Sequence, residues 1–334
     1  MDDAVFMARA LTLAEAGRFT VSPNPMVGCV VVRDGEIVGE GFHERAGGPH
    51  AEVGALRRAG DRARGATVYV SLEPCNHTGR TGPCTAALLD AGVARVVAAV
   101  ADPHPQAGGG AAALRAAGVD VVLGVMEAEA RRLNTVFFHG IDTGRPFVVA
   151  KAAISIDGRI AAADGTSQWL TGEAARERVH RLRAEADAVV VGSGTVLADN
   201  PRLTCRLDGY TGTQPLRVVL DRRGRLGPDF HVMDQSQAPT LLLARTEPHE
   251  VVARLWDRGV RSVLVEGGAG VLHAFLAAGL VDRFEVHVAP VLLGDRGRPL
   301  LAGPWAETLA DAPRFALGGV AHIGADAVLT LEAA

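Results

Sequence analysis

Three metal-binding side chains and one carboxylate lie close together early in the chain. His50 is followed two residues later by Glu52, and Cys75 and Cys84 come further along. One imidazole and two thiolates are a known ligand set for a catalytic zinc, which keeps its fourth position for water. A carboxylate beside such a site can accept the proton of that water. The pattern therefore predicts a catalytic zinc centre with His50, Cys75 and Cys84 as ligands and Glu52 as the acid–base group.

The spacing of these residues resembles the signature of zinc nucleobase deaminases, which is H-x-E followed by P-C-x-x-C. In that signature the glutamate is not a ligand. The first half is present as His50-Ala51-Glu52. The second half departs from the signature, because eight residues separate Cys75 from Cys84.

Two prolines predict that two of the ligands lie at helix N-termini. Pro49 and Pro83 each precede a proposed ligand, and helix-like runs follow at residues 51–58 and 85–91. Proline is favoured in the first helical turn, where the free N–H groups stabilise a thiolate. The imidazole and the carboxylate are two positions apart and would diverge in mid-helix. They can face one site only at the open end of a helix.

A closed zinc knot that only stabilises the fold is the alternative to a catalytic centre. Such a knot needs four ligands, and His43 or His77 is available as the fourth. It would give Glu52 no role, which favours the catalytic interpretation. The remaining cysteines, Cys29 and Cys205, are predicted to be structural residues of the core.

The composition predicts an ordinary cytoplasmic protein. At 334 residues, of which 48% are hydrophobic, the chain is long enough for two domains with full cores. A formal net charge of −4 without a long basic run argues against a nucleic-acid partner. The acidic N-terminus predicts no signal peptide, and no apolar run approaches the ~18 residues of a membrane span. Four cysteines, two of them in the metal motif, suit a reducing compartment.

Hydrophobic periodicity predicts an α/β chain in two parts. Strands are expected at residues 27–32, 36–41, 67–72, 93–100 and 119–122, and then at 147–153, 187–191, 216–220, 240–243, 262–265, 284–289 and 327–331. Helices are expected at residues 4–17, 51–58, 85–91, 111–117, 127–138, 173–186, 248–258 and 270–278. The segment 140–146, with two glycines and a proline, is predicted to be a linker. The expected domains are therefore residues 1–145 and 146–334.

Two glycine-rich turns in the second part predict a nucleotide-binding site. Residues 192–195 follow a strand, and residues 266–270 join a strand to a helix, an arrangement that can hold a phosphate. Neither turn spells G-x-G-x-x-G, so the ordinary dinucleotide fold is not supported. Asp221 is a candidate cofactor contact, since Arg222 and Arg223 beside it would favour the 2′-phosphate of NADP over NAD. The alternative is a turn with two solvated arginines.

The motifs of both parts resemble those of the bacterial bifunctional riboflavin-biosynthesis deaminase–reductases. In the first part they are Pro23-Asn24-Pro25, His50-Ala51-Glu52, Glu73-Pro74-Cys75 and Gly79-Arg80-Thr81 ahead of Pro83-Cys84. In the second they are Lys151, Asp157-Gly158-Arg159, Ser167-Gln168-Trp169, residues 192–204, Glu266-Gly267-Gly268 and Gly279-Leu280-Val281-Asp282. The eight-residue gap between the cysteines is the spacing of this family. Gly82 and Ile156 are small departures, where the family often has proline and leucine.

This resemblance implies a cytidine-deaminase-like α/β/α domain followed by a dihydrofolate-reductase-like α/β domain. It implies zinc-dependent deamination of 2,5-diamino-6-(5-phosphoribosylamino)pyrimidin-4-one, a phosphorylated small molecule. NADPH-dependent reduction of the ribosyl chain to ribityl would follow. It also implies a homo-oligomer that associates through the reductase half.

The resemblance further assigns roles to individual residues. His50, Cys75 and Cys84 carry over as zinc ligands and Glu52 as proton donor. Lys151 and Asp199 lie where the hydride chemistry occurs. The implied substrate contacts are Asn24 and Arg80 in the first domain, and Ser167, Arg183, Leu203, Arg206 and Glu266 in the second. The implied NADP contacts are Ala153, Trp169, Thr195, Asp199, Gly268, Ala269, Gly270, Val271, Leu272, His273 and Ala274.

Three other interpretations compete with the two-site enzyme. The chain would be a single-function zinc nucleotide deaminase if its C-terminal half only assembled oligomers, and then it would bind no NADPH. A deaminase of tRNA or DNA would be retained on a polyanion, which the acidic balance disfavours. The third alternative is a zinc-stabilised sensor, which would stay intact when Glu52 is changed to Gln.

Overall fold

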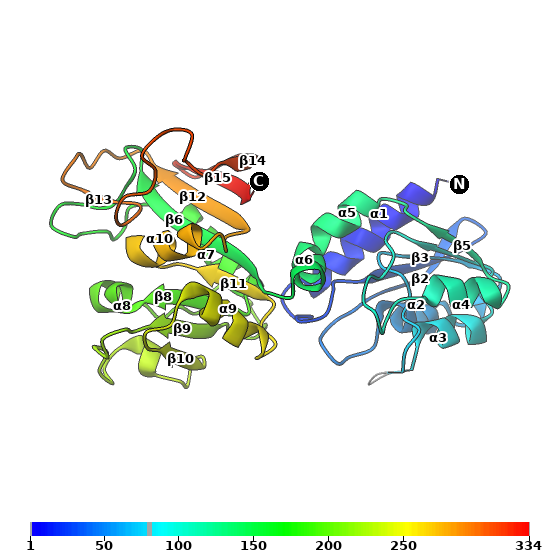
Figure 1. Cartoon of the computed structure of the whole chain (residues 1–334). Coiled ribbons are helices and arrows are strands. Elements are labelled where there is room, and N and C mark those ends of the chain that lie inside the picture. The colour runs from blue at the N-terminus through cyan, green and yellow to red at the C-terminus, as the bar shows by residue number, and fades with distance from the viewer. Residues whose placement is uncertain (1, 79–81, 334) are drawn as a thin grey trace. The chain divides into compact units, whose positions relative to one another are not determined.

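The computed structural model describes residues 2–78 and 82–333, which fold as two compact units, Met1–Gly144 and Arg145–Ala334 (Figure 1). Each unit has its own sheet and its own hydrophobic clusters. No helix in the described part of the chain has both the length and the apolar character needed to span a bilayer.

The first unit alternates strands and helices. Its elements are α1 (Asp3–Ala14), a 3₁₀ turn (Glu15–Gly17), β1 (Gly28–Arg33), β2 (Glu36–Phe42), α2 (Ala51–Ala59), a 3₁₀ turn (Gly60–Ala63), β3 (Thr67–Val70), α3 (Cys84–Ala91), β4 (Arg95–Ala98), α4 (Gly110–Ala116), β5 (Asp120–Leu123), α5 (Glu127–Leu133) and α6 (Thr135–Thr143).

These elements form three layers, with a five-stranded sheet in the middle. The strand order is β2-β1-β3-β4-β5, in which β1 is antiparallel to both neighbours and β3, β4 and β5 are parallel. Alternate residues of β1 enter opposite clusters, Cys29 and Val31 on one face and Val30 and Val32 on the other. Residues of α2, α3 and α4 complete the first cluster, and residues of α1, α5 and α6 the second. Both faces of the sheet are therefore covered.

Glycines set how closely two helices approach this sheet. A Cβ on Gly28 would lie 2.0 Å from the Ala10 carbonyl oxygen of α1, and one on Gly41 would lie 2.4 Å from the Ala51 oxygen of α2. Both distances are far inside van der Waals contact. The N-terminus of α2, which carries the first metal-site residues, is therefore held against β2 at a distance that only glycine permits.

The second unit begins with its central strand. Its elements are β6 (Phe147–Ser155), β7 (Arg159–Ala161), α7 (Glu173–Glu185), β8 (Ala188–Gly192), α8 (Ser193–Asp199), β9 (Leu216–Leu220), a 3₁₀ turn (His231–Met233), β10 (Thr240–Leu243), α9 (Pro248–Trp256), β11 (Ser262–Val265), α10 (Ala269–Ala277), β12 (Arg283–Ala289), β13 (Arg298–Pro299), β14 (Phe315–Ile323) and β15 (Asp326–Ala333).

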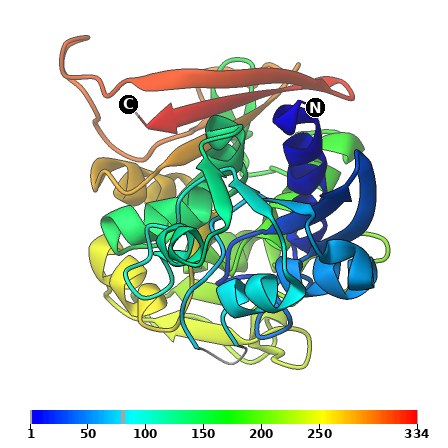
Figure 2. The same ribbon diagram turned by 90° about the vertical axis from the view of Figure 1, so that its right-hand side faces the viewer.

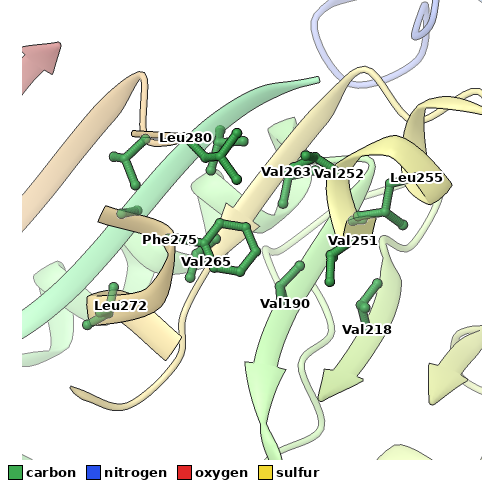
Figure 3. Packing of buried hydrophobic residues seen from close by; sticks show 14 of the residues in the cluster. Val190, Val218, Val251, Val252, Leu255, Val263, Val265, Leu272, Phe275 and Leu280 are labelled. Atoms are coloured by element: carbon green, nitrogen blue, oxygen red, sulfur yellow. The ribbon is translucent and has the colours of Figure 1, made fainter. Parts of the chain in front are cut away.

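An eight-stranded sheet of order β10-β9-β8-β11-β6-β12-β15-β14 forms the core of this unit. The strands from β10 to β12 are parallel, and β15 and β14 join at the end as an antiparallel hairpin (Figure 2). Side chains of α9 and α10, such as Leu255 and Phe275, pack on Val190, Val218 and Val265 of one face (Figure 3). Residues of α7 and α8 cover the other face. The short strands β7 and β13 pair separately.

Most predicted elements are confirmed, but the expected helix 127–138 is wrong in one respect. The chain forms two helices there, because Asn134 between α5 and α6 leaves the helical conformation with φ −106°. Its side-chain amide instead binds the backbone N–H and carbonyl of Met26, at 2.8 and 2.9 Å. Moreover, α6 continues to Thr143, so half of the segment predicted as a linker is helical.

Four further elements were not predicted. The segment 192–195 was expected to be a turn, but it opens α8, since Gly192 is extended and the helix begins at Ser193. The strands β7 and β13 have three and two residues and carry too little pattern to be recognised. Most of β14 is exposed, and it contains two adjacent glycines, so it lacks the alternation of a half-buried strand.

A fully buried arginine connects the loops around the second sheet. Arg217 lies in β9 with no exposed surface. Its guanidinium donates to the carbonyls of Arg202, His231, Asp234 and Ala238 at 2.6 to 3.3 Å. One side chain thus fixes the segment after α8 to the segment 231–238.

We expect Arg217→Met to lower the free energy of unfolding of the second unit by roughly 3 kcal/mol or more, because each buried acceptor left without a donor costs about 1–3 kcal/mol. All three tryptophans, Trp169, Trp256 and Trp305, lie in this unit, so their fluorescence during urea denaturation of the whole chain reports on it. Arg254→Met is the control, since Arg254 is exposed and, among the described residues, its side chain pairs with Glu250 of its own helix. An equal effect of both changes would contradict the prediction.

Candidate active sites

The three predicted zinc ligands converge on one point of the first unit. His50 Nδ1 lies 3.2 Å from Cys84 Sγ and 3.5 Å from Cys75 Sγ, and all three donor atoms lie within 4.8 Å of one another. Among the described residues, neither His43 nor His77 joins this group. An imidazole and two thiols at these distances fit a tetrahedral zinc with one position left open.

Two helix N-termini hold these ligands, as predicted. His50 is the N-cap of α2, and Cys84 is the first residue of α3. Cys75 comes after β3, and its sulfur accepts a hydrogen bond from the Cys84 backbone N–H at 3.4 Å. The hydrogen bond from the Cys84 thiol lowers the pKa of Cys75, and the same contact with burial raises the pKa of Cys84. One sulfur of the pair is therefore stabilised as a thiolate by its neighbours.

Glu52 lies beside the ligands, and one of its carboxylate oxygens accepts no hydrogen bond from the described residues. Its side chain is only 3% exposed, and Oε2 has no hydrogen-bond partner among the described residues. Burial raises the pKa of this carboxyl group. A buried carboxylate oxygen without a partner is costly to the fold, so it indicates a role toward a bound molecule.

A cavity of about 460 Å³ opens in front of this group. Its lining includes Asn24, His43, Glu52, Asp102 and His104. The volume lies within the usual range for small-molecule sites. Titratable groups therefore surround the space in front of the metal ligands on several sides.

The orientation of Asn24 in this cavity is fixed by a histidine. His43 Nδ1 lies 3.0 Å from the Pro49 carbonyl, so Nδ1 carries the proton and Nε2 accepts from Asn24 Nδ2 at 3.0 Å. Burial lowers the pKa of His43, which keeps the ring neutral. Both ring nitrogens are thus engaged within the protein, which argues against His43 as a fourth zinc ligand. The Asn24 side-chain oxygen stays available to a ligand.

The buried carboxylate of Glu73 anchors another part of the cavity wall. Glu73 accepts from the backbone N–H of Asp102 at 2.9 Å and from that of Ala111 at 2.8 Å. A Cβ on Gly110 would lie 1.8 Å from the Pro74 carbonyl oxygen. The loop after β4 is therefore pressed against the segment that carries Cys75.

A second and larger cavity, of about 1100 Å³, lies in the second unit. It lies at the ends of the parallel strands, where open α/β sheets bind their ligands. The predicted contacts that line it are Lys151, Ala153, Ser167, Trp169, Arg183, Thr195, Asp199, Leu203, Arg206, Glu266 and residues 268–272. The structure thus brings together residues that are up to about 120 positions apart in the sequence.

Two of the predicted substrate contacts bind one another. Arg183 of α7 donates to both carboxylate oxygens of Glu266, at 2.6 and 2.7 Å. Both side chains are about nine-tenths buried. Because each neutralises the other, the pair is a rigid part of the cavity wall with the remaining guanidinium N–H groups free to face a ligand.

Lys151 and Asp199 face the same cavity and form no ion pair within the described chain. Burial lowers the pKa of Lys151, against the effect of the nearby Glu266 carboxylate. The Ser167 hydroxyl lies 3.4 Å from Asp199 Oδ1. Uncompensated titratable groups in a cavity are candidates for acid–base chemistry.

A helix N-terminus with a glycine turn forms one end of the cavity. Gly268 is the N-cap of α10 without a side-chain cap, and its N–H donates to Thr195 Oγ1 at 3.1 Å. The following N–H groups of the first turn are therefore available to an anion. Trp169 is 70% exposed and stacks on the Arg176 guanidinium, 4.8 Å from the ring centroid. These features fit a nucleotide phosphate and an aromatic ring.

Two family descriptions match the chain. The cytidine and deoxycytidylate deaminase zinc-binding region matches residues 1–100, and the RibD C-terminal domain matches residues 146–329. The chain belongs to the RibD family. It is accordingly a bifunctional enzyme of riboflavin biosynthesis, with an aminohydrolase activity that uses zinc and a reductase activity that uses NADPH.

Relatives support this membership over the full length. The chain is 46% identical to the riboflavin biosynthesis protein RibD of Escherichia coli K12, with 100% of each covered, and 49% identical to that of Mycobacterium tuberculosis, with 94% and 92% covered. The solved RibD of Acinetobacter baumannii superposes with a TM-score of 0.93 at 41% identity, covering 99% and 98%. A deaminase/reductase of Thermotoga maritima gives 0.92 at 37%, covering 99% of each.

The predicted fold class is confirmed by the RibD match. The first domain is cytidine-deaminase-like, and the second has the dihydrofolate-reductase-like α/β fold. The predicted enzyme class and the two cofactors are confirmed as well.

Three predicted cofactor contacts, Asp221, His273 and Ala274, are not among the residues that line the second cavity. Arg80 lies outside the described residues. His273 and Ala274 follow the lining residues of α10 but do not line the cavity themselves. Asp221 also lies away from the lining, where it accepts from the Leu226 backbone N–H at 3.1 Å. The two arginines that follow Asp221 are exposed, which favours the alternative of a solvated turn.

Sequence reasoning missed part of the RibD lining. Arg176 and His180 of α7 line the second cavity beside Arg183. Their spacing of four and then three positions puts them on one helical face, which is a signal that could have identified them. In the first cavity, the sequence indicates His43 only as a possible fourth zinc ligand, and it gives Asp102 and His104 no role. Nothing local marked those residues as lining.

Proposed function

We propose that residues 1–145 deaminate the phosphoribosylamino-pyrimidine and that residues 146–334 then reduce its sugar. The observation that carries the proposal is the group of His50, Cys75 and Cys84 with the unpartnered Glu52 carboxylate at the floor of a cavity. The donor set fits a catalytic zinc, and the second cavity fits a nucleotide beside uncompensated acid–base groups. The Thermotoga maritima relative is described as a deaminase and reductase of this substrate type.

In the deaminase site we assign proton transfer to Glu52. When bound, zinc supplies a water that is less acidic than beside three histidines, because two thiolates cancel the charge of the ion. Glu52 would take one proton of the attacking water and pass it to a ring nitrogen of the substrate. It would then take the second proton from the same oxygen and deliver it to the departing amine. The balance is one water consumed, one C–N bond replaced by C–O, and one ammonia released.

We assign the recognition of the pyrimidine to Asn24. Its Nδ2 is occupied by His43, so its carbonyl oxygen accepts from an N–H of the substrate ring. Arg80, outside the described residues, is proposed to bind the substrate phosphate as a permanently charged guanidinium.

In the reductase site we assign the proton to Lys151 or Asp199. When bound, NADPH supplies the hydride that goes to the sugar carbon. One of the two uncompensated side chains supplies the accompanying proton, so the product gains two hydrogens. The Arg183–Glu266 pair and Ser167, Leu203 and Arg206 form the substrate side of the site. The residues proposed to bind NADP are those of the predicted contacts that line the cavity: Ala153, Trp169, Thr195, Asp199, Gly268, Ala269, Gly270, Val271 and Leu272.

We further propose a cytoplasmic enzyme that forms a homo-oligomer through its reductase half and does not act on nucleic acid. The net charge of −4 supports the last point, since a nucleic-acid partner would require a basic surface.

The product mass tests the proposal as a whole. The diaminopyrimidine ribosylamino phosphate is incubated with the zinc-loaded protein, with and without NADPH, and the products are analysed by mass spectrometry. Exchange of an amine for oxygen without NADPH, and a further gain of two hydrogens with it, is the expected result. Exchange alone in both samples would leave a single-function deaminase and refute the reductase assignment.

A further inference from the structure

A row of buried ionisable side chains lies beneath the reductase cavity. Glu285 and His287 of β12 are 1% and 0% exposed. In the parallel pairing of β12 with β6, Glu285 is opposite Lys151 and His287 is opposite Ala153. Residues opposite one another share a face of the sheet, with neighbouring strands about 4.8 Å apart. The two buried side chains therefore continue the row that begins with the cavity residues Lys151 and Ala153.

An arginine from the covering helix binds this carboxylate. Arg178 of α7 donates from its Nη2 to Glu285 Oε1 at 2.5 Å and from its Nε to Oε2 at 3.3 Å. His287 Nε2 lies 3.5 Å from the same Oε2, beyond a hydrogen bond of good geometry. Neither ring nitrogen of His287 has a hydrogen-bond partner among the described residues. The Glu285 carboxylate is thus fixed from one side, with Lys151 beside it on the other strand.

Charged groups of both signs surround Lys151. The ionisable residues that share its cavity or its face of the sheet are Arg176, Arg178, His180 and Arg183 from α7, Asp199 from α8, Arg202 and Arg206 after it, His231, Glu266 after β11, Glu285 and His287 from β12, and Arg298 from β13. On the far side of β12, β15 places the uncharged Thr330 and Val328 opposite Glu285 and His287. Burial lowers the pKa of His180, to about 4, and that of His287, so both are neutral at pH 7. Among the carboxylates, Glu266 and Glu285 are the two whose charge raises the pKa of Lys151.

We propose that Glu285, held by Arg178, is a positioning residue of the reductase step that acts through Lys151. Its buried carboxylate keeps the lysine ammonium protonated and directed along the sheet toward the cavity. Because the Arg178 guanidinium partly neutralises that carboxylate, it determines how strongly the carboxylate stabilises the lysine ammonium. This inference rests on the proposed role of Lys151 in reduction and adds a buried residue that acts on its charge together with Glu266.

Two substitutions with opposite expected effects test the inference. Glu285→Gln removes one of the two carboxylates whose charge favours the Lys151 ammonium, so the pKa of Lys151 falls by about one unit. Arg178→Gln leaves the Glu285 charge unshared, so the pKa of Lys151 rises. The pKa is read from the pH dependence of Lys151 acetylation by acetic anhydride, followed by mass spectrometry of the zinc-loaded full chain. The same shifts are expected in the pH profile of kcat for reduction of the supplied deaminated intermediate by NADPH.

Controls separate this role from a structural one. Glu285→Asp keeps the charge and should restore the wild-type profile. Glu332→Gln removes a carboxylate that is also paired with an arginine, Arg283, on the same sheet, and should change neither measurement. If the acetylation pKa is the same in both test variants as in the wild type, or if it moves while the reductase profile does not, the inference is wrong. Reduction that survives Lys151→Met would refute the proposed role of Lys151 instead, while the acetylation result would still report on Glu285.

Discussion

Glu52→Gln is expected to abolish ammonia release while the protein keeps one zinc per chain. The carboxylate lies beside the ligands but is not one of them, and its Oε2 has no partner in the described part of the protein. The amide has nearly the same shape but cannot accept and return a proton. General acid–base catalysis contributes about 10²–10⁴-fold, so a loss in that range is expected. Ammonia release and metal content are measured on the same preparation.

Glu40→Gln is the matched control for this substitution. Glu40 lies in β2 of the same unit, is 30% exposed and pairs with Arg9, so the control should deaminate like the wild type. The Glu52→Gln protein should also reduce the supplied deaminated intermediate at the wild-type rate. Loss of the metal in the variant would show that Glu52 supports the ligands. Full deamination with the metal in place would exclude it as the proton carrier.

The metal site could be predicted from the sequence because its determinants are local. Each ligand follows a strand end or a proline that begins a helix, and both features are readable over a few residues. The structure places His50 at the N-cap of α2 and Cys84 at the start of α3, as the two prolines indicate. The position of Glu52 follows from that of His50, since only the first turn of a helix can direct both side chains to one point.

The partners of the reductase residues could not be predicted in the same way. Arg183 and Glu266 are separated by 83 positions, and nothing in either segment indicates that they bind one another. Glu285 and His287 alternate with the apolar Phe284, Val286 and Val288 of β12. Only the pairing of β12 with β6 reveals that they neighbour Lys151. The break at Asn134 likewise depends on Met26, which is 108 positions away. Such contacts result from the topology of the sheet and the packing of its helices.

Asp199→Asn is expected to remove reduction and to spare deamination. Asp199 is the last residue of α8 and lines the second cavity. Among the described residues it forms no ion pair, and its side chain makes a long contact with the Ser167 hydroxyl. The amide keeps the volume and the hydrogen-bonding capacity but cannot donate a carboxylic proton or balance the charge of Lys151. We expect kcat for reduction to fall by about 10²–10⁴-fold, the usual contribution of an acid–base group. NADPH oxidation with the supplied deaminated intermediate is the measurement.

The same preparation provides the internal control for Asp199→Asn. Deamination takes place in the other unit and should proceed at the wild-type rate, and Asp257→Asn, at the exposed end of α9, should leave both steps unchanged. If KM for NADPH rises while kcat is kept, Asp199 binds the cofactor and the proton must come from Lys151. If both steps fail in a protein whose tryptophan fluorescence and urea midpoint are those of the wild type, the two reactions do not occur at two separate sites. Loss of reduction alone, with KM for NADPH unchanged, assigns Asp199 to the chemical step, because an interaction that is needed only in the transition state lowers kcat without weakening binding.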